Sequence, residues 1–325
     1  MEAWMEIFLI TLQAVVTLLG IGVLGFWIIG RHRVSSETLS FLSVLSIDIA
    51  VPCLVLASLV IDFSPQKNPD WWHMPLWWLG FLALTLLLSL LCCLAAKREH
   101  RGEFAMGLFY QNGLFFPLII ITGLFGTQNP YFIPLFLMVF LHPTLMFSTY
   151  SFFFPKKGHA QSFNAVRFFN PVLVSTIVGM TIALIGFQSY VPQFVKAIFI
   201  MVGAMASPLF MMILGGNLYQ DMMLEAGGRR KFYYAEVVKF SLAKNILFPL
   251  VVLGILILIE PAFPVALIIM LEAAVPPVTA IPIFAERSGG NRALCSQFIV
   301  GSFLFSLVSI PFVLYLFSRF FPFPG

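Results

Sequence analysis

The sequence predicts an all-α polytopic membrane protein, with ten transmembrane helices in two inverted repeats of five. Composition indicates the class: 60% of the 325 residues are hydrophobic and only 10% are charged, whereas soluble domains carry about 45–50% apolar and about 25% charged residues. Apolar runs recur along the chain, and the basic residues between them divide unevenly. A soluble globular enzyme is therefore excluded, and the outer side chains are expected to face a lipid bilayer.

The chain contains ten apolar runs that approach or exceed the length of about 20 residues needed for a spanning helix. They cover residues 8–29, 38–61, 75–96, 104–125, 131–154, 171–187, 194–219, 234–258, 263–284 and 294–318. The first run follows Glu2 and Glu6 instead of a basic segment, which indicates a retained span and not a cleaved signal peptide. Asn170-Pro171 predicts the start of the sixth helix, with an N-cap and a first-turn proline. Turn residues separate other runs, at Ser64-Pro65, Gln128-Asn129-Pro130, Gly227-Gly228 and Ser288-Gly289-Gly290.

Basic residues lie mostly on one side of the expected bilayer. If the runs alternate in direction, 15 Lys and Arg fall on one side, and the 3 on the other are Lys67, Lys196 and Arg319. Positively charged loops stay in the cytoplasm, so both termini are expected outside it. The prediction is a multi-pass protein of the plasma membrane, or of the inner membrane if the source is bacterial.

Prolines at matching places indicate an internal repeat. Pro52 and Pro208 fall in runs two and seven, 156 residues apart, and Pro117 and Pro276 fall in runs four and nine, 159 residues apart. Each repeat holds an odd number of spans, so the halves must insert in opposite directions. The expected repeats are residues 1–158 and 159–325, in one membrane domain with no soluble domain. Paired broken helices in inverted repeats are typical of secondary transporters, which bind substrate at the breaks, although single mid-span prolines are also tolerated as kinks.

Two acids lie inside apolar runs, each four residues before a proline: Asp48 before Pro52, and Glu272 before Pro276. An ionisable side chain in the bilayer costs at least about 2.5–3.5 kcal/mol, so it normally faces the protein interior and has a function. Positions i and i+4 share a face of a helix, and the proline disrupts the turn on that face. Both acids are candidates for proton or ion coupling. A structural carboxyl group that is hydrogen-bonded to a neighbouring helix is the alternative.

Run four contains Tyr110-Gln111-Asn112-Gly113, followed by Pro117. Two amides and a glycine are unfavourable in an apolar helix unless the helix opens and the amides find a partner. Such a break would free backbone N–H groups at the positive end of a half-helix, which favours a carboxylate ligand. Gln111, Asn112, Gly113 and Pro117 are therefore candidate substrate-binding residues, and Tyr110 is a secondary one. Amide hydrogen bonds between helices are the alternative.

Run nine supplies the matching candidates Pro276, Pro277 and Thr279, because consecutive prolines predict an unwound stretch. Two further residues are secondary candidates. Lys244 in run eight could balance an anionic substrate, although a lysine that snorkels to the membrane surface is the alternative. His142 in run five is a candidate proton relay, or a hydrogen-bonded interior histidine.

Recognised enzyme motifs do not accompany these candidates. Gly20-Ile-Gly22-Val-Leu-Gly25 fits a dinucleotide-binding pattern but lies inside an apolar run, where glycines let helices pack closely. The four cysteines match no metal-binding spacing. The chain is therefore expected not to be an enzyme and to bind no metal, organic cofactor or nucleic acid, with H+ or Na+ as the possible coupling ion. A tryptophan belt at the outer membrane interface is predicted at Trp71, Trp72, Trp77 and Trp78.

Segments along nearly the whole chain resemble, in order, the auxin efflux carrier family, which includes plant PIN-type carriers and bacterial malonate-type permeases. The resemblance lies in Leu19-Gly20 to Gly30-Arg31, Leu39 to Val51-Pro52-Cys53-Leu54-Val55, Asn170-Pro171-Val172-Leu173, Pro208-Leu209, Leu214-Gly215-Gly216-Asn217-Leu218 and Val275-Pro276-Pro277 to Gly289-Gly290. Some positions differ. Tyr110 and Phe115 stand where the family's fourth helix usually has Asn and Gly, and Asp48 and Glu272 stand where the family usually has apolar or small residues.

The resemblance implies ten helices in two inverted five-helix repeats, with broken crossing helices four and nine. Helices one, two, six and seven would form a scaffold, and the others a moving core. It also implies a homodimer, elevator-like transport of small organic anions, and a site around Pro117 and Pro276-Pro277. The expected function is a secondary active transporter, for efflux or coupled to protons, of a mono- or dicarboxylate. A ligand-sensing membrane protein that does not transport, and an uncoupled uniporter or channel, are the alternatives.

Overall fold

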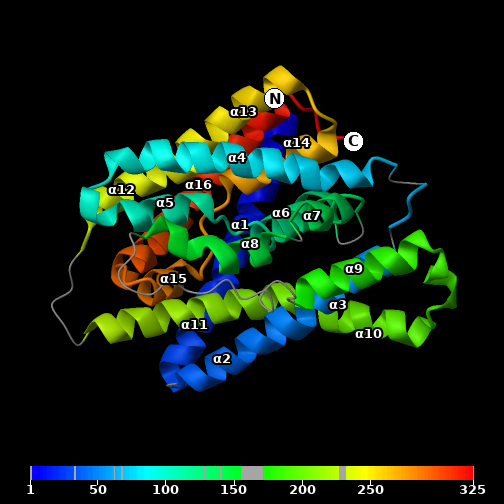
Figure 1. The fold of residues 1–325 in the computed structure, drawn as a ribbon, viewed down its shortest axis with the longest axis horizontal. Coiled ribbons are helices and arrows are strands. Elements are labelled where there is room, and N and C mark those ends of the chain that lie inside the picture. Colours follow the sequence, from blue (N-terminus) through cyan, green and yellow to red (C-terminus); the bar gives the residue numbers. More distant parts are fainter. Residues whose placement is uncertain are drawn as a thin grey trace.

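The computed structural model describes residues 2–32, 34–61, 63–66, 69–126, 129–139, 141–154, 171–226 and 232–324. Within these ranges the chain is built from helices, without a β-strand (Figure 1). Six helical segments are long and apolar enough to cross a membrane, and three shorter apolar helices accompany them. These features confirm a polytopic all-α membrane protein. The number of ten spans stays a prediction, and the predicted cap residue Asn170 lies outside the described residues.

One group of helices is built around α1 (Glu2–His32) and α11 (Ala206–Ala226), which pack along each other. Gly22 and Gly25 of α1 contact α11, and a Cβ atom on Gly215 of α11 would collide with the α1 backbone. The predicted role of these α1 glycines in close helix packing is confirmed. Beside this pair lie α2 (Ser36–Val44), the π-helix η1 (Leu45–Ala50), α3 (Val51–Ile61), α9 (Pro171–Leu184) and α10 (Gln193–Gly203).

Runs two and seven are both irregular near their middle. Run two passes through η1 just before Pro52, and run seven turns at residues 204–205 between α10 and α11. The two irregular stretches contact each other. Ser46 Oγ donates a hydrogen bond to the Ala206 carbonyl oxygen at 3.5 Å, and a Cβ atom on Gly203 would lie 2.7 Å from Leu54 Cα. Run two is therefore π-helical just before Pro52, and α3 continues through this proline without an unwound break.

The second group of helices contains the two runs with candidate site residues. Its elements are α4 (Met74–Cys92), α5 (Arg101–Phe109), α6 (Phe115–Phe125), α7 (Phe132–Val139), α8 (His142–Thr149), α12 (Tyr234–Leu242), the π-helix η8 (Ala243–Leu247), α13 (Phe248–Ile259), α14 (Phe263–Ala274), α15 (Ile281–Arg287) and α16 (Arg292–Ser318). Four short 3-10 helices accompany this group: η2 (Trp71–His73), η3 (Cys93–Ala95), η4 (Arg98–His100) and η5 (Tyr150–Phe153). Another, η7 (Phe187–Tyr190), follows α9 in the first group. Helix α1 joins the two groups by packing against α16 and α6.

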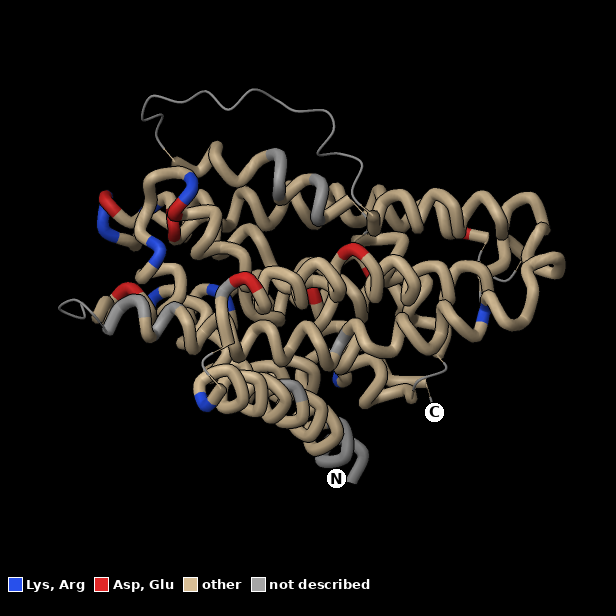
Figure 2. Tube along the Cα trace, turned by 90° about the horizontal axis from the view of Figure 1, so that it is seen from below, with Lys and Arg blue, Asp and Glu red and all other residues tan. Residues whose placement is uncertain are grey.

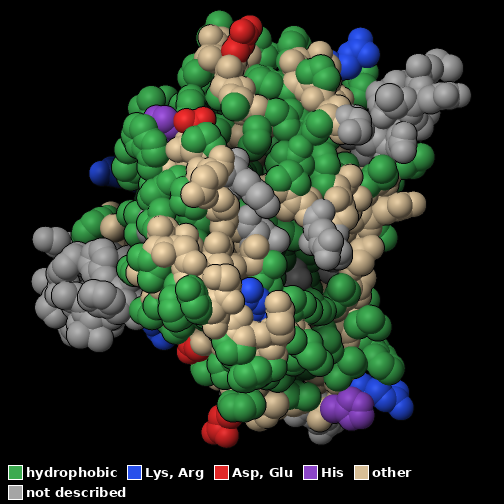
Figure 3. All heavy atoms as spheres, turned by 90° about the vertical axis from the view of Figure 1, so that its right-hand side faces the viewer, with side chains coloured by type: hydrophobic (Ala, Val, Ile, Leu, Met, Phe, Trp, Pro, Cys, Tyr) green, Lys and Arg blue, Asp and Glu red, His purple; other side chains and the backbone are tan. Residues whose placement is uncertain are grey.

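The outer surface is apolar and the charged residues gather near one end. Large hydrophobic side chains such as Val23, Phe41, Leu258 and Val308 are exposed, and Figure 3 shows a face composed mainly of such side chains. Most Lys and Arg drawn in Figure 2 lie toward one end of the molecule. This distribution is typical of a protein that sits in lipid with its charged loops in water.

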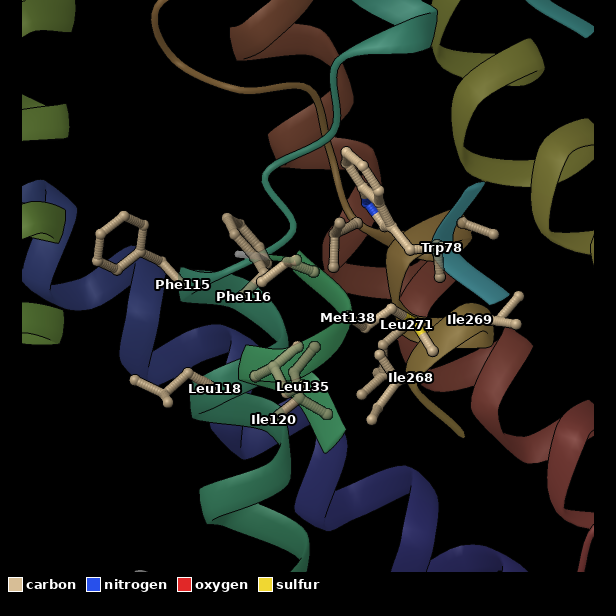
Figure 4. Close-up of a cluster of buried hydrophobic side chains, with 14 of the residues drawn as sticks. Trp78, Phe115, Phe116, Leu118, Ile120, Leu135, Met138, Ile268, Ile269 and Leu271 are labelled. Atoms are coloured by element: carbon tan, nitrogen blue, oxygen red, sulfur yellow. The ribbon is translucent and has the colours of Figure 1, made fainter. Parts of the chain in front are cut away.

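The core lies where α4, α6, α7 and α14 meet. Figure 4 shows Trp78 of α4, Phe116 of α6, Leu135 of α7 and Leu271 of α14 turned toward one another, and each is buried. Trp78 was expected in the interfacial belt, so its burial corrects that prediction. The polar residues described next are enclosed by this apolar core, which raises the energetic cost of leaving them without partners.

Candidate functional site

Runs four and nine are both interrupted, and the interruptions pair with each other. Residues 110–114 separate α5 from α6, and residues 275–280 separate α14 from α15. The Asn112 N–H donates to the Pro276 carbonyl oxygen at 2.9 Å, and the Val278 N–H donates to the Tyr110 carbonyl oxygen at 2.9 Å. Gln111 and Pro277 therefore form an isolated antiparallel bridge. Two unwound segments that are far apart in the sequence become one structural unit.

Prolines explain the interruption of run nine. Pro276 and Pro277 lack the N–H needed for a helix and disfavour helical geometry in the residue before them. Val275 accordingly has an extended ψ of 150°. Pro117, in contrast, lies in the first turn of α6, after the interruption of run four. Pro276 lies inside its interruption, so the two prolines take different places relative to the breaks. The internal repeat itself stays a prediction.

Glu272 lies in the last turn of α14, directly before the interruption, and is fully buried. Its carboxyl group rests on Gly113: a Cβ atom at that position would lie 2.7 Å from Glu272 Cδ. Both carboxyl oxygens lack a hydrogen-bond partner within the described part of the chain. Native proteins rarely leave buried polar atoms unpartnered, and such atoms point to a bound ion, water or ligand. The position predicted for Glu272, inside the protein beside a break, is what the structure shows.

Two amide side chains lie beside this carboxyl group. Gln111 and Asn112 are buried, and in the described residues both polar atoms of the Gln111 amide and the Asn112 Nδ2 are unpartnered. The break in run four was expected to free backbone N–H groups, and the Pro276 carbonyl oxygen accepts the one of Asn112. The side-chain amides of Gln111 and Asn112 provide unpartnered donors beside it.

Lys244 is also fully buried, in the π-helix η8. Its ammonium lies 5.4 Å from the centroid of the Phe248 ring and acts electrostatically on Glu272. Since a snorkelling lysine would expose its ammonium, that alternative is wrong. The neighbouring Asn245 donates to the Ser302 carbonyl oxygen at 2.9 Å and to Ser309 Oγ at 3.2 Å, which ties η8 to α16.

His142, at the start of α8, lies between two aromatic rings. Its ring centroid is 6.2 Å from that of Trp78 and 6.4 Å from that of Tyr110, both edge-on, and it neighbours the Gln111 backbone. The Tyr110 hydroxyl is bonded to Thr149 Oγ1 at 2.5 Å, and Thr149 donates to the Leu145 carbonyl oxygen at 2.7 Å. Tyr110 and His142 therefore connect the break in run four to α8.

Two predicted residues do not join this cluster. Asp48 is exposed on the outside of η1, so the expectation that it faces the interior is wrong. The π-helical turn places its side chain on the opposite side from the buried Ser46 and Ala50. Thr279 lies in the interruption of run nine but is only half-buried.

Cavities of different size lie around the cluster. A cavity of about 40 Å³, lined by Leu114, His142, Val55, Val172 and other residues, separates the break from α3 and α9. Water occupies about 30 Å³ per molecule in the liquid, so this space suits water and not an organic ligand. A larger cavity of about 660 Å³ extends from Arg101 and Gly290 to Phe109 and Thr149, next to the break in run four. Another, of about 500 Å³, is lined by residues such as Trp71 and Pro264.

Apolar helices with polar residues gathered at two paired breaks define a polytopic membrane protein with an interior polar site. A family model described as membrane transport protein matches residues 10–165 and 159–314. The chain therefore belongs to this family, the auxin efflux carrier family, whose members are membrane transporters and not enzymes. A search of curated proteins finds no match to the chain.

Proposed function

We propose that the chain is a secondary active transporter of a small organic anion, with its substrate site at the paired interruptions of runs four and nine. The observation that carries this proposal is the set of buried, unpartnered polar groups on Gln111, Asn112 and Glu272 at that place. A carboxylate ligand would accept hydrogen bonds from the two amides, and Lys244 would balance its charge. Glu272 would take up a proton, since a buried carboxyl group in a membrane normally has such a function.

The architecture proposed for this activity has ten spans in two inverted repeats, residues 1–158 and 159–325, with runs four and nine crossing at their breaks. The antiparallel bridge between Gln111 and Pro277 supports the crossing. The helices around α1 and α11 would form a scaffold, and the second group of helices would move against it in an elevator-like step. The closed space of about 40 Å³ beside His142 supports a step of this kind, because a ligand needs the two groups to separate.

Uptake by the purified protein in proteoliposomes tests the proposal. The probes are radiolabelled lactate, malonate and citrate, which carry one, two and three carboxyl groups. We expect uptake of at least one probe, reduced about tenfold or more in Asn112→Ala, which loses an amide donor worth roughly 1.4 kcal/mol or more. Asn217→Ala, in α11 and away from the breaks, is the matched control. Uptake by Asn112→Ala and Pro277→Ala equal to wild type would place the site elsewhere.

The same preparation separates transport from the two alternative functions. Thermal stabilisation by a probe without uptake of any probe would indicate a ligand sensor. Uptake that is unchanged across pH in wild type, Glu272→Gln and Asp48→Asn would indicate an uncoupled uniporter or channel. A secondary transporter driven by protons predicts faster uptake when the outside is more acidic.

A further inference from the structure

Glu272 and Lys244 are two opposite charges buried at the same place without a direct bond. Helix α14, which carries Glu272, packs against η8, which carries Lys244. Both side chains are fully buried and each acts electrostatically on the other. The ion pairs formed within the described ranges join other residues. The two groups therefore lie buried on elements that contact each other, and no ion pair within 4.0 Å joins them.

Elements packed against α14 carry few other ionisable groups among the described residues. On α16 these include Tyr315 and Arg292, which pairs with Glu286. Helices α6, α7 and α13, which also pack against α14, carry no ionisable side chains. Cys295 on α16 is influenced by Glu103, and Cys92 on α4 by Cys93. His142 is influenced by Lys244, and Tyr110 is held by Thr149. Among the described residues, Lys244 is therefore the basic group that acts on Glu272.

The charges of Glu272 and Lys244 limit the net charge of a ligand that this site can hold. With both groups ionised, the empty site is neutral, and an uncompensated buried charge is strongly unfavourable. A carboxylate that enters alone would leave one excess negative charge. A carboxylate that enters with one proton on Glu272 leaves the sum at zero, because Lys244 then balances the ligand in place of Glu272.

We propose that Lys244 and Glu272 form a site that takes up one proton with each monoanionic carboxylate. The transport of the carboxylate is then electroneutral. The proton comes from water and adds to a Glu272 carboxyl oxygen, and no other bond forms or breaks. The freed Lys244 ammonium and the unpartnered amides of Gln111 and Asn112 then hold the carboxylate. This inference rests on the proposed function and adds the substrate's charge and the coupling ratio to it.

The substrate class follows from the same charge balance. Lactate brings one negative charge, which one proton offsets. Malonate and citrate bring two and three, and among the described residues of the site His142 is the one further candidate proton acceptor that Lys244 influences. We therefore expect lactate to be taken up well, and citrate poorly, at a pH where all their carboxyl groups are ionised.

Lactate uptake into proteoliposomes with separately controlled pH and membrane potential tests the inference. A pH one unit lower outside is expected to support roughly tenfold accumulation, because one proton moves with each anion. A membrane potential imposed with potassium and valinomycin at equal pH is expected to drive no accumulation of lactate. Lactate accumulation driven by the membrane potential at equal pH would overturn the proposal of electroneutral transport. This measurement needs only the wild-type protein.

Variants test the residue assignment. Lys244→Met is expected to lose the tenfold accumulation, Lys244→Arg to retain it in part, and Lys196→Met in α10 to behave as wild type. Undiminished accumulation in Lys244→Met would overturn the role of Lys244. Failure of wild type to take up lactate, malonate and citrate would instead overturn the proposed function, so the two failures are distinguishable.

Discussion

At the scale of single residues, Gly113 decides where the Glu272 carboxyl group can lie. A methyl group at this position would occupy the space of that carboxyl group, which is the movable end of a flexible side chain. Gly113→Ala should therefore displace Glu272 without distorting the backbone. We expect carboxylate uptake to fall severalfold, while the free energy of unfolding changes by about 1 kcal/mol or less.

The control for Gly113→Ala is Gly254→Ala in α13, where a Cβ atom would meet nothing within 4 Å. Uptake in proteoliposomes and thermal unfolding in detergent measure the two effects. Loss of stability without loss of uptake would show that Gly113 serves packing alone.

Asp48 and Glu272 each lie four residues before a proline inside an apolar run, but their surroundings in the structure differ. Glu272 is enclosed and Asp48 is exposed. We expect uptake to rise as the outside pH falls, because protonation of Glu272 accompanies binding. Glu272→Gln, a permanent mimic of the protonated acid, should remove this dependence, and Asp48→Asn should retain it. Initial rates between pH 5 and 8 measure the difference, and the reverse result would move the coupling role to Asp48.

At the scale of helices, close backbone contact joins α1 to α11. A Cβ atom on Gly215 would collide with the Gly22 carbonyl oxygen and approach the Phe26 nitrogen to 2.7 Å. Backbone atoms cannot rotate away as a side chain can, so Gly215→Ala should lower the free energy of unfolding by about 1–3 kcal/mol. Gly20→Ala, also on α1 but facing open space, is the matched control. Equal melting temperatures for the two variants in detergent would contradict the packing argument.

The interruptions show how much of an element local sequence can predict. Consecutive prolines at residues 276–277 predict an unwound stretch because they remove N–H donors and restrict Val275. The prolines do not predict the partner of that stretch. Its pairing with Gln111 depends on α5, α6, α14 and α15 meeting end to end, which is a property of the packed helices. The proline spacing likewise does not predict that Pro117 follows its break whereas Pro276 lies within one.

At the scale of the whole molecule, the distribution of Lys and Arg orients the protein. Thirteen of the eighteen basic residues fall on one side when the ten runs alternate and Lys239 and Lys244, which lie inside run eight, are left out. This distribution predicts a cytoplasmic location for that side. Epitope tags at both termini should therefore be digested by a protease added to intact cells, without permeabilisation. A cytoplasmic tag in the loop at residues 226–232 should be protected. Termini on opposite sides would require an odd number of spans.

The sequence by itself determined the membrane class, the places where helices are interrupted, and the presence of an acid beside one break. These follow from composition, from the missing N–H of proline and from the cost of a charge in lipid, which are all local properties. Tertiary structure alone decided that Asp48 faces outward, that Trp78 and Lys244 are buried, and that Lys244 faces Glu272. Whether a side chain is buried depends on which other helices pack against its face of the helix. The sequence of a single apolar run does not specify those helices.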